Sequence, residues 1–133
     1  MSQTGPRTLP RTRVWVDSST EPLALAEIAD TAASRSHGLL GRDRLAPGDG
    51  LILDPCRLIH TFFMRFAIDI VFFDRHHRVT RVARDVRPFR FAWGGWSARV
   101  TLELPAGTLA RIPVGSGAQL RLEPASAAED GAA

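Results

Sequence analysis

The chain has 133 residues, of which 44% are hydrophobic and 23% are charged, a balance typical of one globular domain and unlike that of a disordered chain. All 17 basic residues are arginine, so the isoelectric point of about 10.8 accompanies a formal net charge of only +3. The charge therefore gives little support to a nucleic-acid partner, and the arginine content is typical of a protein encoded by a GC-rich genome.

No stretch approaches the roughly 20 apolar residues that a membrane-spanning helix needs, because the longest one, residues 66–73, contains Asp69. Residues 1–11 have no apolar core of the kind that a secretory signal contains. Cys56 is the single cysteine, so no internal disulfide can form. We therefore expect a soluble, cytoplasmic domain without a membrane partner.

Residues 1–11 and 124–133 are rich in small residues and proline and lack periodicity, which predicts disordered tails around a single domain of residues 12–123. A helix is predicted over residues 31–41, with Asp30 or Thr31 as its N-cap. The predicted strands cover residues 12–16, 23–29, 51–53, 66–73, 78–86, 99–104 and 118–122. About seven short strands and one short helix indicate a mainly β or α+β fold, a compact barrel or sandwich.

Two of these strands alternate apolar and polar side chains. Residues 66–73 carry apolar side chains at the even positions, which are predicted to face the core and leave Arg65 and Asp69 on the opposite face. Residues 99–104 show the same pattern, which predicts that Glu103 lies on the outward face of its own strand.

Four separated motifs occur in an order that resembles a known family of small prokaryotic domains. They are residues 29–31 leading to 38–42 and Leu45, then residues 50–53, 61–74 and 102–107. Over about residues 23–122 they are similar to the domain of unknown function 192, also called the uncharacterised ACR family. The sequence departs from the commonest pattern at Leu40-Gly41, where Met and usually an aromatic residue occur, and at Phe63, where Trp is usual. The resemblance implies a fold but no activity, substrate or catalytic residue.

Asp69 is a carboxylate in an otherwise apolar strand, so it needs either a polar partner or a solvated cleft. Arg42, just after the predicted helix, could pair with Asp69 or Glu103 and anchor the helix to the sheet. Alternatively, Asp69 and Glu103 share a ligand in a polar cleft, because paired carboxylates are a usual arrangement for acid–base chemistry. The candidate ligand-binding residues are Arg42, His60, Arg65, Asp69, Trp93 and Glu103.

Cys56, His60 and Met64 are four residues apart, a spacing that would gather soft metal ligands on one face of a helix. The surrounding residues indicate a strand, where residues four apart are about 13 Å distant, too far for a metal with ligand distances of about 2.0–2.3 Å. We therefore predict no metal and no cofactor. An enzyme, such as a hydrolase that uses Cys56 with His60 or Asp69 with Glu103, remains an alternative.

Arginines recur every third residue in segment 75–90, close to several aromatic residues, which suggests RNA binding as a further alternative. In a strand, a period of three alternates between the two faces, so no continuous basic stripe results. Arginines that protect a solvated sheet edge explain the pattern more simply. Residues 93–96, Trp-Gly-Gly-Trp, are predicted to form a turn whose two tryptophans either cover a pocket as a flap or fill the end of the barrel as a plug. A small molecule or a protein is therefore the expected partner, rather than nucleic acid.

Overall fold

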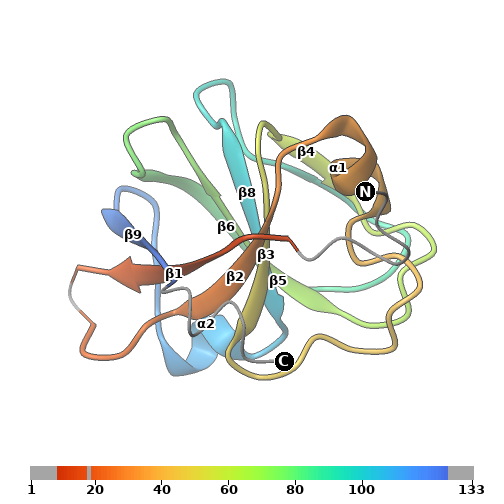
Figure 1. Cartoon of the computed structure of the whole chain (residues 1–133), viewed down its shortest axis with the longest axis horizontal. Helices are drawn as coiled ribbons and strands as arrows, with labels where there is room; N and C mark the ends of the chain where they lie inside the picture. Colours follow the sequence, from red (N-terminus) through yellow and green to blue (C-terminus); the bar gives the residue numbers. More distant parts are fainter. Residues whose placement is uncertain (1–8, 18, 126–133) are drawn as a thin grey trace, which may run out of the picture.

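Nine strands and two short helices make up the part of the chain that the computed structural model describes, residues 9–17 and 19–125 (Figure 1). The elements are β1 (Arg11–Val16), β2 (Ala24–Ala29), α1 (Ala32–His37), β3 (Asp49–Leu53), β4 (Leu58–His60), β5 (Ile68–Phe73), β6 (Val79–Val86), β7 (Phe91–Trp93), β8 (Val100–Pro105), α2 (Thr108–Arg111) and β9 (Leu120–Pro124). Among the described residues, no helix has the length and apolar character needed to cross a bilayer. The predicted mainly β fold is confirmed.

Seven strands form one curled sheet in the order β6-β5-β8-β3-β2-β1-β9 (Figure 1). Neighbouring strands run antiparallel, except β2 and β3, which are parallel. The two edge strands approach each other where Arg78, just before β6, pairs with Gln119, just before β9. The sheet is therefore a half-barrel, and β4 and β7 form a separate antiparallel pair beside it.

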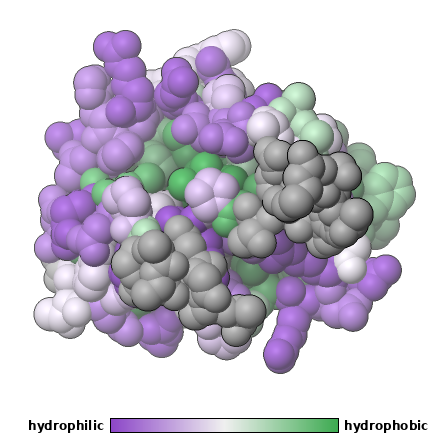
Figure 2. All heavy atoms as spheres, viewed as in Figure 1, coloured by the Kyte–Doolittle hydropathy of each residue, from purple (hydrophilic) through white to green (hydrophobic). Residues whose placement is uncertain are grey.

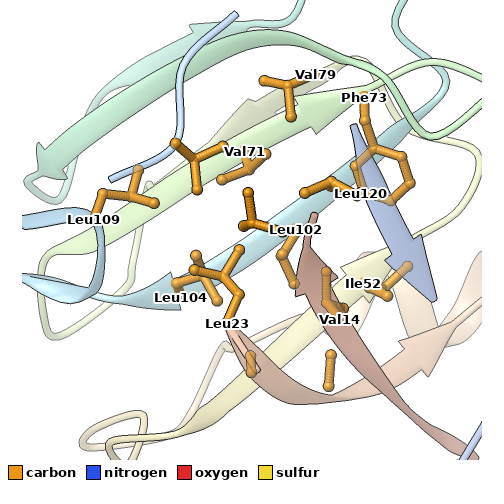
Figure 3. Close-up of a cluster of buried hydrophobic side chains, with 14 of the residues drawn as sticks. Val14, Leu23, Ile52, Val71, Phe73, Val79, Leu102, Leu104, Leu109 and Leu120 are labelled. Atoms are coloured by element: carbon orange, nitrogen blue, oxygen red, sulfur yellow. The ribbon is translucent and has the colours of Figure 1, made fainter. Parts of the chain in front are cut away.

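Apolar side chains cover both faces of this sheet. The cluster inside the half-barrel includes Leu102 and Leu104 of β8 and Val71 of β5 (Figure 3). A second cluster lies on the outer face, where Ile70 and Phe72 of β5 are packed with residues of β3, β4 and the connecting loops. Strands β5 and β8 are consequently buried on both faces.

The prediction that residues 99–104 have a solvated outward face is wrong. Thr101 is fully buried and Glu103 is only 4% exposed. The physical reason is the second layer over the outer face, which includes Leu39, Ile59 and Met64. Alternation within one strand shows that side chains point to opposite faces, but it does not show what covers each face.

The predicted helix is shorter than expected. Thr31, one of the two predicted N-caps, forms a capping box with Ser34, but α1 ends at His37 because Gly38 has a positive φ of 49°. Strands β4 and β7 and helix α2 were not predicted, since three or four residues are too few to show a periodicity.

The fold extends into both predicted tails. Strand β1 already begins at Arg11, and β9 includes Pro124. Positions 1–8 and 126–133 of these predicted tails lie outside the described residues.

Gly94 follows β7 and lies against the buried ring of Phe72, so an added side chain has no room. A Cβ atom at Gly94 would lie 2.5 Å from the Phe72 side chain. We expect Gly94→Ala to lower the free energy of unfolding by roughly 1–3 kcal/mol, measured by urea denaturation. Gly115→Ala is the matched control, because a Cβ there meets nothing within 4 Å. Equal urea midpoints for the two variants would contradict this packing.

Candidate functional site

A pocket lies on the outer side of the sheet, between the segment around α1 and strand β4. Its volume is about 190 Å³. It is lined by Arg35, Ser36, His37, Gly38, Leu39, Leu40, Leu53, Pro55, Cys56, Leu58, Ile59, His60, Met64 and Glu103. The walls are thus mainly apolar, and Glu103 is the one acidic residue among them.

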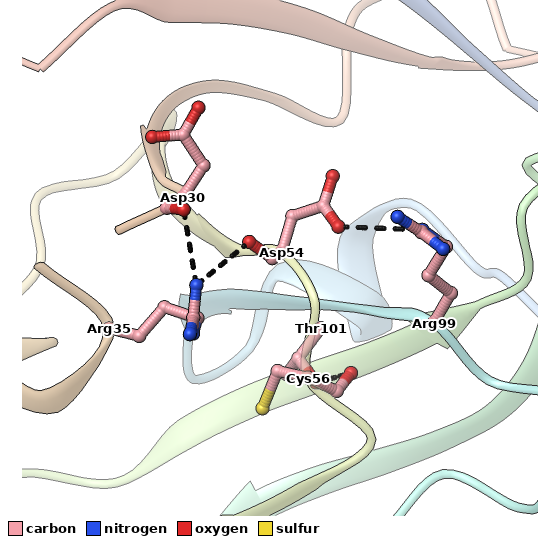
Figure 4. Close-up of polar contacts among 6 residues, drawn as sticks. All are labelled: Asp30, Arg35, Asp54, Cys56, Arg99 and Thr101. Atoms are coloured by element: carbon pink, nitrogen blue, oxygen red, sulfur yellow. Dashed lines mark hydrogen bonds and ion pairs between the residues drawn. The ribbon is translucent and has the colours of Figure 1, made fainter. Parts of the chain in front are cut away.

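Hydrogen bonds and an ion pair hold the loop that follows β3 in place beside this pocket (Figure 4). Arg35 donates to the carbonyl oxygens of Asp30 at 3.1 Å and Asp54 at 3.3 Å. The Asp54 carboxylate lies 3.7 Å from Nε of Arg99, and the hydroxyl of Thr101 donates to the carbonyl oxygen of Cys56 at 3.0 Å. The pocket wall from residue 53 to residue 56 is therefore tied both to the helix segment and to β8.

Glu103 reaches the pocket from the middle of β8. It lies opposite Leu51 of β3 and Ile70 of β5, and both of these neighbours belong to the outer apolar cluster. No described residue donates a hydrogen bond to its carboxyl group. Burial raises the pKa of Glu103 from its ordinary value of 4.5 to about 7, and the charge of Arg42 partly opposes this shift. An acid held in this way titrates near neutral pH.

Arg42 pairs with a different carboxylate from those that the sequence analysis proposed. Its guanidinium group donates to Oε1 of Glu27 on β2 at 3.1 Å. The prediction of an ion pair that anchors the chain after the helix to the sheet is therefore right in kind but wrong in partner. Arg42 acts on Glu103 through its charge and does not line the pocket.

Asp69 and Glu103 do not share a cleft, so this part of the predicted site is wrong. In the pairing of β5 with β8, Asp69 lies opposite Leu104, whereas Glu103 lies opposite Ile70. Because successive side chains of a strand point to opposite faces, Asp69 points into the half-barrel and Glu103 points away from it. The sheet itself separates the two carboxylates.

Asp69 has a structural role instead. Its Oδ1 accepts the N–H of Asp85 at 2.8 Å, and its Oδ2 accepts the N–H of Leu109 at 2.9 Å. Asp85 has a positive φ of 51° where the β5–β6 pairing shifts register, and Leu109 is in the first turn of α2, whose N-cap Gly107 makes no side-chain hydrogen bond. The Asp69 carboxylate thus supplies the cap that α2 lacks and fixes β6 to β5.

Cys56 and His60 both line the pocket, but neither activates the other. The Cys56 thiol donates to the carbonyl oxygen of Leu58 at 3.4 Å, and Nδ1 of His60 accepts the N–H of Phe62 at 3.3 Å. The thiol proton and the imidazole lone pair are therefore both used by main-chain groups. Within the described ranges, no group of three or more His, Cys, Asp or Glu side chains is arranged to hold a metal ion.

Arg65 and Trp93 lie outside the pocket. Arg65 is exposed and donates to Oδ1 of Asp43 at 2.6 Å. The ring of Trp93 packs edge-on against that of Trp96 at 5.1 Å. The turn between these tryptophans packs against Phe72, so it is neither a flap over the pocket nor a plug of the half-barrel.

Most of the pocket lining was missed in the sequence analysis. His60 and Glu103 were predicted as site residues, and Cys56 as a possible nucleophile, but the segment of residues 35–40 was not. The one available signal was the family-like motif at residues 38–42, which follows the helix. Residues of the walls, such as Leu53 and Ile59, are indistinguishable in sequence from ordinary core residues.

The arginine-rich segment occupies the hairpin before β6, the edge strand β6 itself and the loop that leads to β7. Arg81 and Arg84 on β6 are exposed. Charged side chains on an edge strand discourage pairing with another sheet, which agrees with the simpler interpretation of this segment.

Together, a half-barrel sheet, a second apolar layer on its outer face and a pocket between them define a small β-rich domain with one buried acid at the pocket. The family model of domain of unknown function 192, Uncharacterized ACR, matches residues 14–122, so the chain belongs to this family. The family predicted from the four motifs is thereby confirmed. No curated protein matches the chain in sequence.

Two solved structures share the fold. One, from Sinorhizobium meliloti 1021, is described as a candidate transcription regulator; it has a TM-score of 0.76 and 22% identity, over 89% of this chain and 98% of the other. The second is a protein of unknown function from Novosphingobium aromaticivorans DSM 12444, with a TM-score of 0.73 and 22% identity, over 84% of this chain and 83% of the other. At this identity the likeness concerns the fold.

The structural role of Asp69 can be tested by replacing one of its carboxylate oxygens with an NH2 group. Asp69→Asn keeps one acceptor oxygen and turns an NH2 group toward a main-chain N–H, so we expect the free energy of unfolding to fall by roughly 2–3 kcal/mol in urea denaturation. Asp43→Asn is the control, because it breaks only the exposed ion pair with Arg65 and should leave the midpoint nearly unchanged. Equal losses in both variants would refute a structural role for Asp69.

Proposed function

We propose that this domain is a binding module and that its ligand enters the pocket and is recognised by the carboxyl group of Glu103. The observation that supports the proposal is a buried carboxyl group that borders a cavity and accepts no hydrogen bond from the described residues. Moving a carboxyl group from water into a largely apolar site costs free energy, and this cost raises the pKa of Glu103. A ligand that donates a hydrogen bond to Glu103 removes this cost when it binds.

The residues of the pocket walls indicate which size and polarity of ligand can bind. Leu39, Leu53, Ile59 and Met64 provide apolar contacts around the acid. A volume of about 190 Å³ is smaller than the roughly 300–1,000 Å³ of pockets for drug-sized molecules, so it suits a group of about the size of one amino-acid side chain. We infer an apolar group that ends in an amine, guanidine or amide.

Other functions have less support. A carboxyl group with a pKa near 7 is suited to proton transfer, but no ionisable side chain lies within hydrogen-bonding distance of Glu103 among the described residues, so a hydrolase is the weaker proposal. The Sinorhizobium neighbour is described as a candidate transcription regulator, a role that usually involves nucleic-acid binding. In this chain, such binding would depend on exposed arginines such as Arg81 and Arg84. Neither arginine lines the pocket that contains Glu103.

The shifted acid predicts a stability that depends on pH. The folded protein binds the Glu103 proton more tightly than the unfolded chain, so the contribution of Glu103 to stability is fully present below about pH 4.5 and is lost as the pH rises through about 7. Because Glu103→Gln stays neutral, it should equal the wild type near pH 4.5 and exceed it by about 3 kcal/mol at pH 8.5. Urea denaturation at the two pH values measures the difference.

The control for this experiment is Glu123→Gln, which makes the same chemical change at an exposed glutamate of β9 that pairs with Arg121. This variant should follow the wild type at both pH values. If Glu103→Gln also follows the wild type at both pH values, the carboxyl group does not lie in a poorly solvated site, and the proposal loses its basis.

Ligand recognition itself can be tested with a fragment library that contains amines, amides, alcohols and carboxylates of similar size. We expect amines and amides to perturb the backbone amide resonances of the pocket residues in two-dimensional NMR spectra, and carboxylates to have no effect. The perturbations should disappear in Glu103→Gln and persist in Glu123→Gln. Fragments that bind equally to both variants, or only outside the pocket, would overturn the proposal.

A further inference from the structure

The pocket lies beside a strand edge that no described strand covers. We infer that the natural ligand is an extended peptide segment of another protein, which pairs with the free edge of β4 and places one side chain in the pocket. This inference rests on the proposed function, since the anchored side chain is the group that Glu103 recognises. It adds the class of partner and the way in which that partner binds.

One edge of β4 forms main-chain hydrogen bonds with β7, and the other edge pairs with no described strand. In the pairing with β7, Leu58 lies opposite Trp93 and His60 lies opposite Phe91. The N–H of Gly94 donates to the carbonyl oxygen of Arg57, and the N–H of Thr61 donates to that of Arg90. In an antiparallel pair these hydrogen-bonded positions alternate with positions that face outward, so the main-chain groups of Leu58 and His60 point away from β7.

The open edge is the one beside the pocket. The Cys56 thiol, a group that lines the pocket, donates to the carbonyl oxygen of Leu58 and therefore lies on the side away from β7. No described group pairs with the N–H of Leu58 or with the N–H and C=O of His60. A short row of main-chain donors and acceptors thus borders the cavity, which is the arrangement that an added peptide strand requires.

Exposed apolar side chains extend this surface beyond the pocket. The aromatic patch consists of Leu58, Phe62, Phe63, Phe89 and Phe91. Phe63, Phe89 and Phe91 are 75%, 63% and 66% exposed, and the rings form a connected series of contacts with 5.0–6.4 Å between centroids. His60 joins the patch to the pocket, because its ring contacts both Phe62 and Phe91. Figure 2 shows apolar residues at the right-hand edge of the molecule, the side on which the loop after β4 lies in Figure 1.

Two residues of the patch have strained backbone torsion angles, and both lie in segments held by hydrogen bonds to Thr61. Phe63 and Phe89 have positive φ angles of 67° and 65°, a conformation that bulky residues rarely adopt. Their rings remain in solvent, so burial within the domain does not offset the strain. Strained residues that present exposed aromatic side chains are typical of binding surfaces.

The charges favour a peptide over a nucleic acid. Arg87 and Arg90 flank Phe89 in the chain and would attract phosphates, whereas Glu103, the one acid that lines the pocket, accepts hydrogen bonds from lysine, arginine or amide side chains. Unpaired main-chain groups on β4 also match the backbone of a strand and not that of RNA. We therefore assign an apolar or aromatic peptide that carries one basic or amide side chain.

The experiment begins with a displayed library of random dodecapeptides, selected on the full chain. We expect the enriched peptides to alternate apolar residues with a lysine, arginine, glutamine or asparagine at one fixed position. A synthetic peptide of the enriched sequence is then methylated on each backbone nitrogen in turn. Because only every second N–H of an added strand faces β4, methylation should reduce affinity at every second residue.

Two sets of protein variants complete the test. Glu103→Gln should weaken binding of the selected peptide at least tenfold, and Glu123→Gln should not. The double variant Phe63→Asn, Phe89→Asn should bind about tenfold more weakly with an equal or higher Tm, because asparagine adopts a positive φ more readily than phenylalanine. Unchanged affinity in the double variant would overturn the role of the patch.

The outcomes separate the two proposals. Loss of binding in Glu103→Gln without alternation in the methylation series would overturn strand addition and leave the pocket as the site. Alternation without any effect of Glu103→Gln would overturn the proposed recognition by Glu103 and leave strand addition. No enriched peptide, or a single-stranded RNA oligonucleotide that binds the patch in its place, would overturn the inference.

Discussion

The antiparallel register between β5 and β8 determines what each buried carboxylate can do. Asp69 lies opposite Leu104 and points into the half-barrel, and Glu103 lies opposite Ile70 and points to the outer layer. A shift of the register by one residue would exchange the faces of a whole strand and bury its polar groups in the wrong layer. The inner cluster, the outer cluster and the pocket all depend on this pairing.

The two carboxylates illustrate opposite solutions to burial. Asp69 accepts main-chain N–H groups with both oxygens, and in doing so it holds β6 and α2 against β5. No described residue supplies such donors to Glu103, and its raised pKa reflects a carboxyl group that burial favours in the neutral form. An acid whose oxygens accept hydrogen bonds within the fold is part of the scaffold, whereas one that faces a cavity is suited to a ligand.

Several independent features of the surface around Glu103 support the proposed peptide ligand. The pocket has apolar walls of a size that fits a side chain, the neighbouring strand β4 has an open edge, and strained phenylalanines extend the apolar surface from His60. Main-chain pairing provides affinity with little dependence on sequence, and a pocket for a single side chain provides specificity. A domain of this size can thereby recognise a short segment of a partner without a large interface.

Several elements of the fold follow from local sequence alone. Period-two alternation at residues 66–73 and 99–104 indicates strands, and Thr31 marks the start of α1, because side-chain direction and helix capping are decided by neighbouring residues. The family motifs likewise lie in short continuous stretches, and they include the turn after α1 that borders the pocket.

The site was decided by contacts between residues far apart in the chain. The sequence shows Asp69 within an apolar strand and Glu103 at a polar position of an alternating one, but their separation by the sheet depends on a register that pairs positions 69 and 104. The pocket depends on a layer from residues 38–66 that covers the outer face, and the open edge of β4 depends on a partner strand more than 30 residues away. Alternation in a sequence thus determines that two side chains point in opposite directions, and only tertiary packing decides which direction leads to a core and which to a cavity.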